Sequence, residues 1–139
     1  MKILRYLQCM SIINPTLCKE TGIIVEVEQR GEGPIPHMHV FHDSERNPRK
    51  CSYVRLDEAS YSAHHKDAVP LPPSVKEKFI IIMKSPWPKH VVETNGELRV
   101  ATGYEAAVDT WAETYENNDL SKFKIDDSGS LVMPDYSKL

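Results

Sequence analysis

The chain has 139 residues, which is enough for one domain but too few for two domains of ordinary size. Apolar residues make up 40% and charged residues 27% of it, which excludes collagen-like, coiled-coil and disordered chains. The net charge of −3 argues against a surface built to neutralise phosphates, so nucleic acid is not a favoured partner.

The first half of the chain is predicted to form strands. In the segment from Gly22 to Gln29, Ile23, Val25 and Val27 alternate with more polar positions, which is typical of a sheet with one wet face. Two glycines and two prolines between residues 30 and 36 predict a stiff loop, and Asn14-Pro15-Thr16 predicts a connection. The four predicted strands cover residues 3–8, 22–29, 37–42 and 51–57.

The second half is predicted to contain two amphipathic helices and two hairpins. Ser74 and Glu77 form a capping-box pattern at the start of the first helix, which Pro86 ends. Asn95-Gly96 between two apolar runs predicts a tight hairpin, because both turn positions of that hairpin need positive φ. Asp126 to Gly129 predicts another turn.

A second capping box at Thr102 and Glu105 begins the second helix. Its apolar stripe contains Tyr104, Val108, Trp111 and Tyr115, which we assign to the core. Strands and helices do not alternate regularly, so the order favours a single α+β domain, 1–139, with a mainly antiparallel sheet and two helices packed on it.

Three of the six histidines lie within the third predicted strand, as His37, His39 and His42. On a strand, His37 and His39 leave the backbone on the same side, with Cα atoms about 6.6 Å apart, whereas His42 points to the other side. This spacing lets two imidazoles share a divalent transition metal or flank an anion. The alternative is that both rings only pack at a sheet rim, bonded to backbone or water.

Tyr53 and Arg55 share one face of the fourth predicted strand. If that strand pairs with the third, these two side chains and the histidine pair would line one polar patch that can bind ligands. A metal site would use His37 and His39 with Glu45 or His64 as further ligands. A metal-free ribonuclease-like site would use His39 as general base and Arg55 to stabilise the charge of the transition state. Tyr53 would position the substrate.

Charge is distributed unevenly along the chain. Residues 1–92 contain 13 Lys/Arg and 10 Asp/Glu, which gives a net charge of +3. Residues 93–139 contain 4 Lys/Arg and 10 Asp/Glu, which gives a net charge of −6. We therefore expect the acidic C-terminal part, including Glu113, Glu116 and Asp119, to contact a basic protein partner.

Several features indicate a cytoplasmic protein. The three cysteines are an odd number without a Cys-x-x-Cys pair, which is typical of reduced thiols. Arg5 interrupts the apolar start of the chain, so we expect no signal peptide. The longest apolar run, Phe79 to Met83, is much shorter than the ~20 residues that span a bilayer, so we expect no membrane segment.

Two resemblances involve the histidine pair. The run from Gly31 to Glu45 is similar to the first cupin motif, which implies a metal-dependent enzyme with His37, His39 and Glu45 as ligands. Ile35-Pro36-His37-Met38-His39-Val40 resembles a family of small bacterial proteins of unknown function marked by Pro-Pro-His-x-His-Val, encoded in toxin–antitoxin-like neighbourhoods. We prefer the second, because its members also have a later helix with a tryptophan, here Trp111, whereas a cupin is nearly all strand.

The sequence therefore favours a small cytoplasmic bacterial binding or regulatory module, associated with toxin–antitoxin systems or mobile elements. We expect the strand with His37 and His39 to line its functional surface. The alternatives are the cupin-like metal enzyme and the ribonuclease-like toxin.

Overall fold

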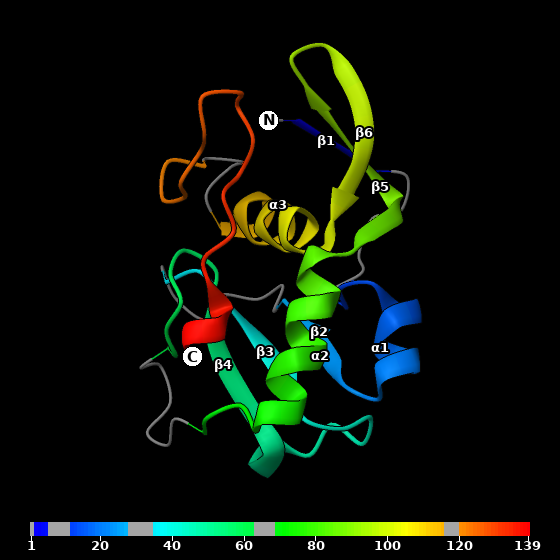
Figure 1. The fold of residues 1–139 in the computed structure, drawn as a ribbon, viewed down its shortest axis with the longest axis vertical. Coiled ribbons are helices and arrows are strands. Elements are labelled where there is room, and N and C mark those ends of the chain that lie inside the picture. The colour runs from blue at the N-terminus through cyan, green and yellow to red at the C-terminus, as the bar shows by residue number, and fades with distance from the viewer. Residues whose placement is uncertain (1, 6–11, 28–34, 63–68, 116–119) are drawn as a thin grey trace.

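The computed structural model describes residues 2–5, 12–27, 35–62, 69–115 and 120–139, which form two three-stranded antiparallel sheets and three α-helices (Figure 1). One sheet has the strand order β1-β5-β6 and the other β2-β3-β4. The elements, in chain order, are β1 Lys2–Arg5, α1 Pro15–Thr21, β2 Ile24–Glu26, β3 His37–Phe41, η1 Pro48–Lys50, β4 Cys51–Arg55, α2 Pro73–Lys84, β5 Pro86–Thr94, β6 Glu97–Thr102, α3 Gly103–Tyr115 and η2 Tyr136–Lys138. The predicted α+β class with antiparallel pairing is confirmed, although the strands divide into two sheets.

Helix α3 lies between the two sheets, as Figure 1 shows. Tyr104, Val108 and Trp111 are buried, which confirms the predicted apolar stripe. They belong to one continuous cluster of buried side chains that also includes residues of α2 and of the β2-β3-β4 sheet. The side chain of Tyr115, the last member of the predicted stripe, lies outside the described part of the chain.

The predicted capping box at the start of α3 is confirmed. The Glu105 N–H donates to Thr102 Oγ1 at 3.2 Å, and the Thr102 N–H donates to Glu105 Oε1 at 3.0 Å. Arg99 on β6 adds a two-pronged contact to the same carboxylate, at 2.8 and 2.6 Å. Burial by itself would raise the pKa of Glu105, but the hydrogen bonds from Arg99 and Thr102 outweigh it and lower that pKa. The hairpin is therefore tied to the helix that follows it.

The capping box predicted for α2 is wrong. The helix begins at Pro73, and its N-cap residue is Pro72, which makes no side-chain capping bond. Proline suits the first helical position because its missing N–H would have no partner there, so Ser74 lies inside the first turn instead of capping it. The predicted apolar face is confirmed, since Val75, Phe79, Ile82 and Met83 are all buried.

Helix α1 falls where a connection was predicted. Asn14 has a left-handed backbone, φ 48°, and its side chain accepts a hydrogen bond from the Leu17 N–H at 3.4 Å. Pro15 then occupies the first turn, and Gly22, with φ 82°, ends the helix.

The C-terminal segment returns across the molecule to α2. The predicted hairpin is reduced to a turn with one bridge, Ile125 to Leu131. Tyr136 then enters the core beside Phe79, with ring centroids 5.0 Å apart. None of the helices within the described ranges has the length and apolarity needed to cross a bilayer.

Candidate functional site

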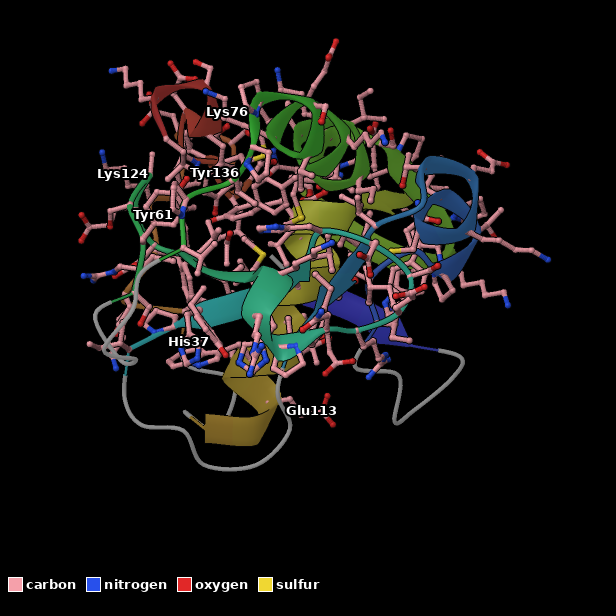
Figure 2. All side chains as sticks on the ribbon, turned by 90° about the horizontal axis from the view of Figure 1, so that it is seen from below. His37, Tyr61, Lys76, Glu113, Lys124 and Tyr136 are labelled. Carbon is pink, nitrogen blue, oxygen red and sulfur yellow. The ribbon has the colours of Figure 1, made fainter. Side chains whose placement is uncertain are left out.

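The two faces of the β2-β3-β4 sheet differ in chemistry. Val25, Met38, Val40 and Val54 are fully buried on the face that joins the hydrophobic core. The opposite face contains mainly polar and titratable side chains, and we call it the histidine face. Its defining residues are Glu26, His37, His39, Tyr53 and Arg55. Figure 2 shows His37 on the side of the sheet away from α2, where Lys76 is labelled.

The structure brings four of the predicted site residues together. Strands β3 and β4 pair antiparallel, with His37 opposite Arg55 and His39 opposite Tyr53. Directly opposite residues of a strand pair point to the same face, so the predicted strand pairing is confirmed. The two imidazoles stack with centroids 5.6 Å apart, and the Tyr53 ring meets His39 edge-on at 4.7 Å.

Glu26 is a member of the histidine face that was not predicted as a site residue. It lies opposite His39 on β2, so Glu26, His39 and Tyr53 form one row across three strands. Its side chain is only 11% exposed, and Oε2 lies 2.7 Å from Arg46 Nη1. The alternation in the second predicted strand placed Glu26 on the wet face, but the pairing of that strand with the histidine strand was not predicted.

Arg55 is engaged by its own neighbours. Its Nε and Nη2 donate to the two carboxylate oxygens of Asp57 at 2.9 and 2.8 Å, and Nη2 lies 3.0 Å from Glu58. The hydrogen bonds to Asp57 are the main cause of the raised pKa of Arg55, so the charge is permanent. A clamp on a reacting phosphate would first have to break this arrangement, which argues against the ribonuclease-like role of Arg55.

The histidine rings are less accessible than expected. His37 is 5% exposed and His39 is 7% exposed. His37 Nδ1 lies 2.9 Å from the Ile35 carbonyl oxygen. Because a carbonyl oxygen can only accept, Nδ1 carries the hydrogen in this contact. The Ile35 carbonyl just before β3 thus orients the imidazole of His37.

The histidine pair does not recruit a third metal ligand from the part of the chain that the structure describes. Across those residues, no three His, Cys, Asp or Glu side chains lie close enough together to hold a metal ion. Glu45 is exposed in the turn after β3, where its N–H donates to Asp43 Oδ1 at 2.9 Å. His64 lies outside the described residues. Of the predicted metal ligands that the structure describes, His37 and His39 lie together and Glu45 does not join them in a group of three.

Part of the predicted acidic surface can be located. Glu113 is exposed near the end of α3, and Figure 2 shows it on the same side of the molecule as His37. Glu116 and Asp119 fall outside the described residues. Of the acidic residues after position 92, Glu105 is already neutralised by Arg99 and cannot contribute to a partner surface.

His42 provides a matched control for the histidine face. It follows β3 with the opposite parity, and its Nε2 lies 2.8 Å from Oγ of Ser52, which is fully buried. The prediction that His42 points away from His37 and His39 agrees with this contact, because Ser52 is opposite Val40 on the core side.

We expect the His42 imidazole to titrate below pH 6.5. Burial is the largest cause that lowers its pKa, and the nearby Asp43 only partly offsets it. Because the folded state disfavours the charged ring, His42 contributes stability above pH 6.5 that is lost as the pH falls through its folded pKa. A ring-proton NMR titration, with His42→Gln to assign the signal, measures this. A value at or above 6.5 would contradict the burial argument.

Comparison of the chain with protein-family models, with curated proteins and with solved structures found no match. The site must therefore be interpreted from its own chemistry.

Proposed function

We propose that the chain is a small binding or regulatory module, and that the histidine face is the surface through which it binds a basic protein partner. The partner contact also includes the acidic end of α3. The observation that carries this proposal is the burial of three titratable side chains, Glu26, His37 and His39, on the sheet face that the hydrophobic core does not use.

Burial of polar groups on that face is costly for folding. A buried polar group lowers stability unless its hydrogen bonds are made, and apolar side chains of similar size would serve the fold at least as well. Natural proteins accept such costs at functional sites more than elsewhere. A concentration of five polar side chains on adjacent strands therefore supports a binding role.

The charges around the face favour a cationic partner over an anionic one. Arg46 is paired with Glu26, and Arg55 is paired with Asp57 and Glu58. Three carboxylates thus surround two guanidinium groups, so the balance is negative. The C-terminal part of the chain adds the same sign. Complementary charge steers association and selects against wrong partners.

The toxin–antitoxin or mobile-element context belongs to this proposal, because it rests on the resemblance of the segment from Ile35 to Val40. A cytoplasmic location is supported by Cys18, a buried free thiol.

The test compares wild type with His37→Ala/His39→Ala, both tagged and purified from producing cells. The wild type and the control His42→Ala should capture the same basic protein. The double variant should capture it at least about tenfold less well, because the buried histidine pair supports the face that the partner contacts. Equal capture by the double variant would overturn the proposal. So would stoichiometric metal in the wild type that the double variant lacks, because that result selects the metal enzyme instead.

A further inference from the structure

Among the described strands, the β1-β5-β6 sheet ends in an open edge at β6, on the far side of the molecule from the β2-β3-β4 sheet. Figure 1 shows the β5–β6 hairpin reaching beyond α3. Strand β6 pairs only with β5 among the described strands. The inner face of the hairpin is covered, since Val92 on β5 and Ala101 on β6 are fully buried. On the outer face of β6, Leu98 is 65% and Val100 is 40% exposed.

The turn geometry determines which backbone groups of β6 point outward. Asn95 and Gly96 have φ of 53° and 81°, so the two-residue turn is of the type in which both central residues have positive φ. The residues flanking such a turn, Thr94 and Glu97, exchange both backbone hydrogen bonds. By alternation, Arg99 then bonds to β5, while Leu98 and Val100 present their N–H and C=O groups to the open edge.

The side-chain contacts agree with this assignment. The Val100 carbonyl accepts a long bond of 3.4 Å from Arg99 Nη1, and the Thr102 N–H donates to Glu105. Both groups are therefore on the outward side of the strand. The devices that usually protect an edge are missing from the middle of β6, which has no lysine or proline, and its arginine is held by Glu105.

We propose that a second copy of this chain pairs with β6 to form a symmetric dimer with a continuous six-stranded antiparallel sheet. The two-fold axis of the dimer passes between the two Arg99 residues, so Leu98 of each copy lies opposite Val100 of the other. Both of these pairs use the outward N–H and C=O groups, and both place their exposed apolar side chains on the same face.

The spacing of the exposed residues fits a second copy as the occupant. Leu98 and Val100 combine outward backbone groups with exposed apolar side chains, and they lie two residues apart. A two-fold axis at the residue between them therefore places Leu98 of one copy opposite Val100 of the other. The residue on the axis, Arg99, points to the opposite face and is neutralised by its own Glu105, so the two arginines do not oppose pairing. This self-complementarity is what an isologous interface requires.

The contact is short, so the dimer should be weak and concentration-dependent. We expect the weight-average mass from analytical ultracentrifugation to rise from 15.9 kDa toward twice that value between roughly 10 µM and 1 mM. Two variants should stay monomeric over this range. Val100→Pro removes an outward N–H without removing a bond to β5, and Leu98→Lys places a charge in each apolar pair.

The control is Ile81→Lys, which changes a residue of similar exposure, 47%, on α2 and should dimerise like the wild type. Circular dichroism tests whether each variant is folded. If Val100→Pro does not fold, Leu98→Lys still tests the proposal. A wild type that remains monomeric at about 1 mM would overturn the proposal. Dimerisation of Leu98→Lys at wild-type strength would also overturn it, because the dimer would then use another surface.

Discussion

Replacing Gly103 with alanine should destabilise the protein by about 3 kcal/mol. Gly103 begins α3 where that helix meets the end of α2, and its N–H donates to the Ser85 carbonyl at 3.0 Å. A Cβ at this position would overlap the carbonyl oxygen of Ile82 and lie 3.1 Å from its carbonyl carbon and 3.3 Å from Met83 Cα. All three are backbone atoms, so relief requires the two helices to separate.

Urea-induced unfolding of Gly103→Ala beside Gly96→Ala measures this effect. Gly96 has φ 81°, and a Cβ added to it would meet no heavy atom within 4 Å, so alanine there costs only its backbone strain, about 1 kcal/mol. If Gly103→Ala lowers the free energy of unfolding by less than Gly96→Ala does, α2 and α3 are not in the close contact described.

Truncating Tyr136 to alanine should cost about 4 kcal/mol, whereas Tyr136→Phe should cost about 1 kcal/mol. The ring is 1% exposed and packs edge-on against Phe79. Its hydroxyl donates to the Arg55 carbonyl at 2.8 Å, and Tyr104 donates in the same way to the Leu56 carbonyl at 2.7 Å. Burial, with nearby Asp57, raises the pKa of both phenols, so both remain protonated donors.

These hydroxyls connect the core to the histidine face, because they hold the end of β4 that carries Arg55. Thermal unfolding gives the two stability losses. Backbone amide shifts of Tyr136→Phe should change around Arg55 and its neighbour on β3, His37, and should not change at the tip of the β5–β6 hairpin. Unchanged shifts at Arg55 would contradict a positioning role of the C-terminal segment.

Local patterns predicted several elements correctly because each depends on a few neighbouring residues. Asn95-Gly96 specified a hairpin, and Thr102 with Glu105 specified the start of α3. Strand parity placed His37 and His39 on one side. The pairing of β3 with β4, proposed from their shared polar residues, then assembled the patch with Tyr53 and Arg55.

The errors concern relations between distant segments or a competing local signal. Two sheets form where one was predicted, because strand parity does not determine which strands pair. Glu26 joins the histidine face only through the pairing of β2 with β3, and Arg46 reaches it from a turn that follows β3. At α2, Pro73 takes the first helical position and displaces the capping pattern of Ser74. At α1, Asn14-Pro15 is a helix start that resembles a turn signal.

The free energy of unfolding of His39→Phe and His39→Leu tests most directly whether the histidine face serves binding rather than folding. His39 is buried and packs against the rings of Tyr53 at 4.7 Å and Phe41 at 6.5 Å, and an apolar side chain of similar size can keep these ring contacts. At least one of the two variants should be as stable as the wild type, or more stable by about 1 kcal/mol. If both lose more than about 2 kcal/mol, the imidazole is a structural group and the histidine face is not maintained for a partner.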